Sequence, residues 1–517
     1  MRVVPANWDN IVKGDIQPLT WGAKISFDKT FDDSITFWTW DTSTWDGGDM
    51  WKGAEDNPIQ AWDYYKYLDY SEAVESIAIT HKLEFPYSVS SAIADFQLKN
   101  EDKYFTPNST SPIASNILPR RPVRLMLGMG DTNLQQFVGL TEGMPEIDSQ
   151  EGTASFTAMD FLTWIYDMPI RNTQAMVNVR TDEVLKQIFL DFGLDESQFS
   201  LQNGRNTIPF LFWQKDQQTA GDVIRPLMEA EMGMLWLDEN GIIQFKPRIE
   251  LPLESSFLLD SDSIHSLDVV GEDQIINRVI ITAAPRELQE PQVIHSMVGL
   301  SDDSVTIGAN SSKPINIELD DPSIDIVTPT LGTDSGLSWI QAYKTDGTEV
   351  NSSITISGMA EQTNSITLFI VNNNPFPVVI ADIFIWGKPA KIKGGKPFEF
   401  NFYEDVSVEK YGEKPFKIDN NFIQNESQAD ALATTMIDNY NEYADLIQAE
   451  IKPNPALQLG DIIEIDYQEF TGNYRIMGIN LKISNSEMIQ VLQLRKYIVR
   501  VYWQWDISLW DEGIWAP

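Results

Sequence analysis

The fold is decided by the stretch Pro455-Ala-Leu-Gln-Leu-Gly-Asp-Ile-Ile-Glu-Ile465 near the C-terminus. It passes from a turn-forming segment into an apolar strand pattern, and similar patterns follow at 473–477 and 488–494. The turn-forming groups Thr471-Gly472-Asn473 and Ser484-Asn485-Ser486 separate these patterns. This part of the chain therefore predicts a set of antiparallel strands.

A helix is predicted directly upstream of this strand set. Apolar residues recur there at helical spacing over about five turns, and Ser427 or Asn425 can cap the first turn. The stripe indicates packing rather than a cofactor site, and it consists of Ala429, Leu432, Ala433, Met436, Ile437, Tyr440, Tyr443, Ala444 and Ile447.

The middle of the chain alternates between helix and strand patterns. Residues 171–250 predict a helix capped by Thr181 or Asp182, a second helix after Thr219 that Pro226 should kink or delay, and a hairpin turning at Asn240-Gly241. Residues 251–400 are mostly strand and loop. The segment 285–335 is polar and irregular, whereas 365–371 and 378–386 predict two strands of a sandwich-like block. Residues 71–170 contain several short, closely spaced strand patterns, typical of a small barrel or sandwich.

The two ends of the chain share a motif. Residues 37–48 and 502–513 both follow the pattern aromatic-W-x-W-D-x-S-x-W-D-x-G, which includes Trp38, Trp40, Trp45, Trp503, Trp505 and Trp510. Exposed tryptophan is costly in water, so these ends should dock on something. Three interpretations stay open: docking on the chain's own body, docking on a neighbouring subunit or partner protein, and stacking on glycan.

Composition excludes several classes of site. The 517 residues suggest about three to five domains and contain no cysteine and only three histidines, so disulfides, thiolate nucleophiles and cysteine-based metal sites are excluded. No apolar run is long enough to span a membrane, and residues 1–10 lack a signal pattern. The net charge of −39 is opposite in sign to that of a protein that grips duplex DNA. It indicates a solvated acidic surface or, for some of the charges, the lining of a passage through which DNA slides.

Several segments together carry a resemblance to a known family. The stretch 455–465 resembles the P-x-L-x-x-G-D-x-V-x-V segment of phage tail hub proteins, and 472–479 then follows as it does in that family. Residues 238–248, of the form D-x-x-G-x-x-x-F-x-P-R, and 98–107 with 120–124 match as well. The chain thus resembles the baseplate hub or tail-tip hub of tailed bacteriophages over residues 70–500.

The resemblance implies a fold and an assembly. It implies an α+β, predominantly β chain with two small hub-type β-barrels, an intervening α/β module and an inserted β-sandwich-like block. The expected divisions are a Trp/Asp-rich arm at 1–70, a first barrel at 71–170, an α/β module at 171–250, the start of the second barrel with a β-rich insertion at 251–400, a long helix with completion of that barrel at 401–500, and a Trp/Asp-rich tail at 501–517. Three subunits would form a six-barrel ring matching a six-fold tube.

Catalytic motifs are absent from the sequence. It has no G-x-S-x-G elbow and no Walker loop. The carboxylates beside tryptophan, Asp41, Asp46, Asp506 and Asp511, are the best glycosidase-like candidates, but their position near the chain ends argues against preorganisation. The acidic turn at 238–240 lacks the spacing of an EF-hand. We expect no enzymatic activity, no cofactor, no metal and no lytic domain on this chain.

The leading functional hypothesis is a structural hub in the virion, at the distal end of a phage tail and made in the host cytoplasm. As a homotrimer it would join tube, tape-measure, distal tail or fibre proteins, and it would pass genomic DNA without tight binding during ejection and host cell entry. Three copies of −39 give −117, so we expect a central opening lined mainly by Asp and Glu. The alternatives are a receptor-binding tail protein that recognises host cell-wall glycan through the 300–400 block or the tryptophan ends, and a glycan-degrading enzyme.

Overall fold

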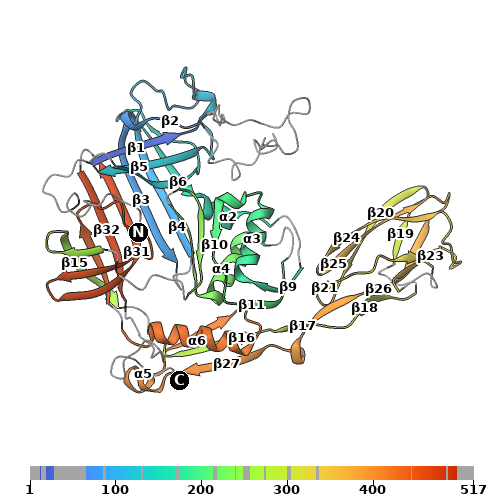
Figure 1. The fold of residues 1–517 in the computed structure, drawn as a ribbon. Coiled ribbons are helices and arrows are strands. Elements are labelled where there is room, and N and C mark those ends of the chain that lie inside the picture. Colours follow the sequence, from blue (N-terminus) through green and yellow to red (C-terminus); the bar gives the residue numbers. More distant parts are fainter. Residues whose placement is uncertain are drawn as a thin grey trace.

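The structure is a computed structural model with five recognisable parts (Figure 1). It describes residues 12, 19–27, 66–84, 89–129, 132–170, 175–213, 218–238, 240–248, 255, 257–272, 275–299, 304–332, 337–443, 445–484 and 487–497. Two β-lobes lie side by side, helices α2–α4 lie next to the first of them, a small α/β layer follows, and a β-rich insertion extends away from the rest. The chain is predominantly β, as predicted, and no helix within the described ranges is long and apolar enough to cross a membrane.

The first β-lobe is built from eight strands among the described residues between 19 and 160. Its strands are β1 (Leu19–Ile25), β2 (Leu68–Asp69), β3 (Val74–Glu84), β4 (Val89–Lys99), β5 (Pro122–Met129), β6 (Thr132–Thr141), β7 (Glu146–Asp148) and β8 (Thr153–Asp160), with the 3-10 turns η2 (Ser71–Ala73) and η3 (Ala114–Asn116). They pair antiparallel in the order β1-β5-β6-β8-β4-β3. Alternate side chains point inward, and the Phe96 and Phe156 rings stack 5.2 Å apart in this core.

Strand β1 differs from the arm predicted for residues 1–70. It pairs with β5 along its whole length, and Ala23, Ile25 and Phe27 are buried in the first lobe. Their period-2 spacing is the signal of a strand with one buried face. Residues 19–27 therefore belong to this lobe.

The second β-lobe is built from two distant segments of the chain. Its strands are β14 (Phe257–Asp260), β15 (Ile264–Glu272), β29 (Asp445–Ile451), β30 (Ile462–Tyr467), β31 (Phe470–Ser484) and β32 (Glu487–Lys496). They pair in the order β14-β30-β31-β32-β29-β15, which includes the predicted antiparallel set. The predicted turn at 471–473 is wrong, because these residues pair with β30; the chain turns at Gln468, where φ is +53°.

An α/β module packs against both lobes. Its elements are α2 (Phe161–Asp167), β9 (Ala175–Arg180), α3 (Thr181–Asp191), η4 (Glu196–Gln198), β10 (Phe199–Leu201), β11 (Thr207–Phe212), α4 (Ala220–Glu231), β12 (Met234–Leu237) and β13 (Ile243–Lys246). Thr219 caps α4 as predicted, and Gly241, with φ of +82°, turns the predicted hairpin. Pro226 does not delay α4, and α3 is capped by Arg180 rather than by Thr181 or Asp182.

A small layer of three strands and two helices follows. It contains β16 (Arg278–Ala283), β27 (Phe398–Tyr403), α5 (Asp405–Tyr411), β28 (Pro415–Asp419) and α6 (Glu426–Tyr440). Asn425 caps α6 as predicted, but the helix ends at Tyr440, so the predicted stripe is too long. Ile447 lies in β29, where its side chain enters the second lobe.

The insertion grows out of the paired strands β16 and β27. Its elements are β17 (Arg286–Leu288), β18 (Gln292–Met297), β19 (Val305–Ile307), β20 (Ser311–Glu318), β21 (Ser323–Ile324), β22 (Thr330–Leu331), β23 (Trp339–Lys344), β24 (Ile354–Gln362), β25 (Ser365–Asn372), β26 (Val378–Ile392) and η6 (Lys393–Gly395). Two sheets, one on β26 and one on β25, share a core of their own. The segment 285–335, predicted to be irregular, contains six strands. The apolar alternation in their sequences is weak, because much of each strand is exposed, as in β20.

Candidate functional site: a sheet face shared by the two lobes

Strand β31 joins the two lobes. Its first part pairs with β30 and carries Ile476 into the core of the second lobe, and its last part pairs with β3 and carries Leu481 and Ile483 into the core of the first. The register shifts at Gly478, where an added Cβ would lie 2.8 Å from the Gln493 side-chain oxygen Oε1. Because one continuous strand belongs to both cores, the two lobes are fixed relative to each other.

The stretch that decides the fold sits at this junction. Gly460 has a φ of +77° and donates its N–H to the Ile476 carbonyl at 2.9 Å. The Pro455 carbonyl accepts a hydrogen bond from Gln136 Nε2 of the first lobe at 3.1 Å. The turn thus contacts both lobes, and glycine is favoured at position 460 because the backbone φ there is positive.

A small cavity lies beside this turn. It has a volume of about 50 Å³, and His81, Asp160, Trp236 and Leu457 are among its lining residues. A water molecule needs only about 10–15 Å³ measured in this way, so there is room for a few waters and not for a substrate. The cavity is therefore part of the junction rather than a ligand site.

The junction creates one continuous face across seven strands, in the order β8-β4-β3-β31-β32-β29-β15. Because strand side chains alternate, every second residue of these strands points away from the cores. Cross-strand pairs such as Asp95 with Ala78, and Thr80 with Asn480, continue the face from one lobe to the next. The outward residues include Ser155, Thr157, Met159, Ile93, Asp95, Gln97, Lys99, Ser76, Ala78, Thr80, Lys82, Asn480, Lys482, Ser484, Glu487, Ile489, Val491, Gln493, Arg495, Leu446, Gln448, Glu450, Ser266 and Asp268.

The face is polar but almost neutral. Its outward residues include four carboxylates, three lysines and Arg495, and most of the others are small or uncharged. Thr157 donates its hydroxyl to Asp95 Oδ1 at 2.6 Å, and Gln97 Nε2 donates to the Thr153 hydroxyl at 3.0 Å. The backbone groups are used in the ladders between strands, so the face offers few free donors to a polyanion.

Two different borders end the face. Beyond β8 the chain forms a rim of residues 142–148, which includes β7 and overhangs a cleft of about 610 Å³. The cleft is lined by Met144 of the rim and by Ser76 and Asp95 of the face. At the opposite end β15 is the last strand, and within the described part of the chain it pairs only with β29.

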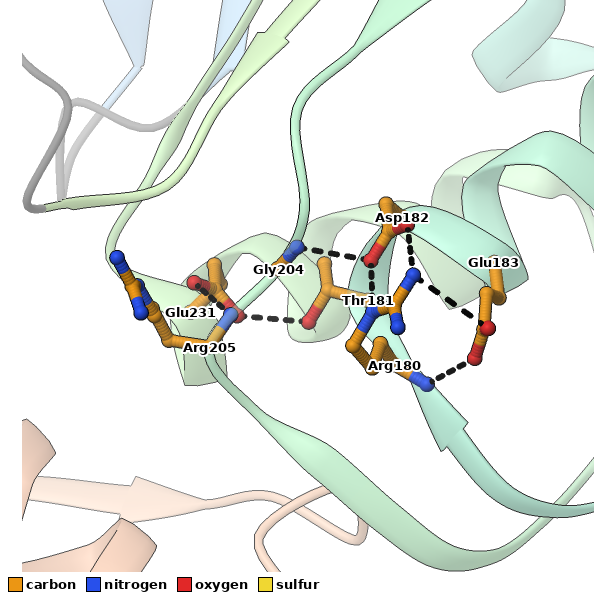
Figure 2. Close-up of polar contacts among 7 residues, drawn as sticks. All are labelled: Arg180, Thr181, Asp182, Glu183, Gly204, Arg205 and Glu231. Carbon is orange, nitrogen blue, oxygen red and sulfur yellow. Dashed lines mark hydrogen bonds and ion pairs between the residues drawn. The ribbon is translucent and has the colours of Figure 1, made fainter.

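A buried polar network lies in the α/β module (Figure 2). The side chain of Glu231, at the end of α4, is completely buried. Its carboxylate accepts hydrogen bonds from the Thr181 hydroxyl at 2.8 Å, Arg205 N–H at 2.9 Å and Asn206 N–H at 3.0 Å. Since these donors come from the start of α3 and from the 202–206 segment, the carboxylate fastens these pieces to α4.

Asp182, in the first turn of α3, belongs to the same network. Burial alone would raise its pKa, but the Arg180 guanidinium and the Gly204 N–H bond its carboxylate, and the pKa lies below its usual range. Arg180 Nη2 lies 2.9 Å from Asp182 Oδ2. Both carboxylates accept several hydrogen bonds from within the protein, so the network holds these segments together.

The residues predicted to dock partners or to act on glycan lie outside the described residues. This holds for Trp38, Trp40, Trp45, Trp503, Trp505 and Trp510, and equally for Asp41, Asp46, Asp506 and Asp511.

The carboxylate of Asp238, in the predicted acidic turn, accepts hydrogen bonds from neighbouring groups of the protein. Asp238 Oδ1 accepts from the N–H groups of Asn240 and Ile242, each at 2.9 Å, and Oδ2 accepts from Gln244 at 2.9 Å. Within the described ranges no group of three or more His, Cys, Asp or Glu residues could hold a metal ion.

Sequence reasoning did not find the shared face. The signal was present in the alternation of Ser76, Ala78 and Thr80 with buried Ile77 and Ile79. What could not be read from the sequence was the pairing of β3 with β31, whose residues lie about 400 positions apart along the chain.

Comparison with known proteins found solved structures that resemble this chain, but no family model or curated sequence that matches it. A 43 kDa tail protein of prophage MuSo2 from Shewanella oneidensis is 10% identical and covers 83% of this chain and 96% of its own, with a TM-score of 0.44. A tail protein from Neisseria meningitidis is 8% identical and covers 83% of this chain and 93% of its own, also with a TM-score of 0.44.

A third match comes from a secretion system. An Escherichia coli component of the type VI secretion system, described as similar to the T4 tail proteins gp27 and gp5, is 8% identical. It covers 82% of this chain and 74% of its own, with a TM-score of 0.37. These three similar structures are thus two tail proteins and a secretion component with likeness to tail proteins.

Proposed function

We propose that this chain is a structural hub or tip protein of a phage tail, in which the two β-lobes are the two small barrels of a hub subunit. Three copies would form a ring that joins the tail tube to the tip or baseplate and encloses a channel for the genome. The observation that carries this proposal is the seven-stranded face, which crosses both lobes without interruption.

The face has the properties that a channel wall needs. It is continuous, its backbone groups are paired, and its outward side chains are mostly uncharged. DNA binds proteins largely through phosphate contacts with Lys and Arg. The three lysines of the face are spread over three strands, and the Arg495 guanidinium already lies over the Tyr440 ring and donates to the Asn439 carbonyl. This wall is closer to neutral than the Asp- and Glu-rich lining expected from the net charge, so most of the acidic surplus lies on other surfaces.

The connection between the lobes supports the same role. A wall that carries load between tube and tip has to keep its lobes aligned, and β31 belongs to both cores. The Gly460 turn and the Gln136 contact fasten the junction from the other side. We propose a load-bearing, non-enzymatic role on this basis.

Recognition of glycan is less well supported by the insertion. Trp339 and Phe384 stack 4.5 Å apart on the outer face of its larger sheet. The neighbouring carboxylate, Asp382, already accepts hydrogen bonds from the Tyr343 hydroxyl and the Gly299 N–H. Stacked rings whose polar neighbours are used internally favour packing over sugar binding.

The absence of cysteine permits a direct test of the wall. Single cysteines at Gln97 and Gln493 would place a thiol on the face in each lobe, and Thr345→Cys provides a control in an exposed turn of the insertion. In the assembled protein we expect both face thiols to react with a small maleimide but to be shielded from a large polymer-linked maleimide. The control should react with both reagents, and equal labelling of all three positions in an assembled ring would contradict the proposal.

A further inference from the structure

We propose that the exposed edge of β15 docks on the 142–148 rim of a second copy of this chain, which closes the shared face into a ring. This inference rests on the proposed hub function and names the subunit contact that such a hub requires. It is argued from the two borders of the face.

The edge of β15 is unusually apolar for a strand at the border of a sheet. The side chains of Val269 and Val270 are 57% and 63% exposed, and the strand pairs only with β29 among the described strands. An edge strand with exposed apolar side chains is a template for pairing with another chain unless something covers it. A partner is therefore expected here.

The shape of β15 limits what that partner can be. Its register with β29 shifts between Ile264 and Ser266 and again between Val269 and Gly271, so two bulges bracket the straight stretch 266–269. Bulges bend a strand and interrupt pairing. The edge can thus accept only a short strand of about four residues.

The opposite border of the same face offers such a strand. β7 spans only Glu146–Asp148 and pairs with β8 alone in the described part of the chain. Met144, which precedes it in the rim, is 50% exposed and supplies an apolar side chain. The three residues of β7 therefore fit the short straight stretch of β15. The exposed side chain of Met144 can pack on the exposed valines of β15.

The positions of the two borders select a second copy as the occupant. They lie at opposite ends of one seven-stranded face, so a head-to-tail contact would carry the sheet from each subunit into the next. Contacts between two different patches of one surface generate a closed ring when the rotation between subunits closes. The same contact would bury the valines and continue the proposed channel wall.

Charge at the contact predicts how assembly responds to salt. The rim carries Glu142 and Glu146, and β15 carries Asp268, so like charges approach one another. Each copy also has a net charge of −39. Near physiological ionic strength such repulsion decays over a screening length of about 8–10 Å, and added salt shortens that length. Assembly should therefore strengthen when sodium chloride is raised, in contrast to a contact held by ion pairs.

Crosslinking of the full chain tests the contact. In the variant with Met144→Cys and Val269→Cys, a short bis-maleimide should join different copies and give covalent dimers and trimers. The matched control combines Met144→Cys with Val298→Cys, because Val298 is 71% exposed on the insertion. It should remain uncrosslinked under the same conditions.

A charge substitution supplies a second readout by native mass measurement. Val269→Lys should weaken self-association about tenfold or more, whereas Val298→Lys should leave it within about twofold. A trimer that forms without Met144–Val269 crosslinks and is insensitive to Val269→Lys would overturn this contact while leaving the hub proposal intact. A chain that stays monomeric at all salt concentrations would overturn both.

Discussion

Gly139 offers a test of the pairing between β6 and β8 in the first lobe. It lies in β6, where β6 meets β8, and a Cβ at this position would lie 2.1 Å from the Met159 carbonyl oxygen and 2.8 Å from the Met159 carbonyl carbon. The obstacle is backbone, so no side-chain rotation can relieve it. Gly139→Ala must push β8 away from β6.

The cost follows from the pairing that would be lost. Gly139, Leu140 and Thr141 pair with three residues of β8, and this pairing connects β5 and β6 to the rest of the lobe. At a net value of about 1 kcal/mol for each hydrogen bond, losing the contact should lower the free energy of unfolding by about 2–4 kcal/mol. Urea denaturation would measure the change, and faster hydrogen exchange in 139–141 would locate it.

A glycine four residues further along is the matched control. A Cβ at Gly143 would meet nothing within 4 Å. Gly143→Ala should therefore change the free energy of unfolding by no more than about 0.5 kcal/mol. If both substitutions had the same small effect, β6 and β8 would not be in contact, and the proposed pairing between them would be refuted.

Three further predictions concern the module and the insertion. Glu231→Ala should cost about 3–5 kcal/mol in urea denaturation, because three buried donors lose their acceptor, and Glu231→Gln should cost less because one carbonyl oxygen remains. Burial lowers the pKa of His295 against the opposing charge of Asp320, so the insertion should lose stability as the pH falls below about 6.5, and His295→Gln should flatten this dependence in thermal melts at pH 5–7. Replacing 286–395 by a short turn should leave the urea midpoint of the lobes unchanged, because Ala283 pairs directly with Phe398; a lowered midpoint would show that the insertion supports them.

Much of the local structure could be predicted from the sequence. The strand set after Pro455, the Asn240-Gly241 hairpin, the Thr219 cap and the sandwich strands of the insertion follow from periodicity and turn chemistry, and the structure confirms them. These features depend on residues within about ten positions of each other, which is the range over which such signals act.

The errors arose where tertiary contacts decide the outcome. The predicted helical stripe extended to Ile447, because the first residues of β29 continue the apolar spacing after α6 ends. The turn expected at Gly472 was displaced to Gln468, because the register between β30 and β31 places Gly472 opposite Ile465. A glycine that favours turns was instead accommodated in a strand at a φ of +110°.

The shared face lay beyond sequence reasoning for a similar reason. Each of its strands shows alternation, yet nothing local indicates that Ala78 will pair with Lys482. Once the structure brings β3 and β31 together, two separate barrel-like patterns become one surface. The proposed function depends on this pairing more than on any single motif.

A three-dimensional reconstruction of the assembled protein by electron cryo-microscopy tests the central claim most directly. We predict a ring of three copies whose central opening is walled by strands β8, β4, β3, β31, β32, β29 and β15 of each copy. A ring in which this face points outward, or an assembly with no opening beside it, would contradict the proposed channel wall.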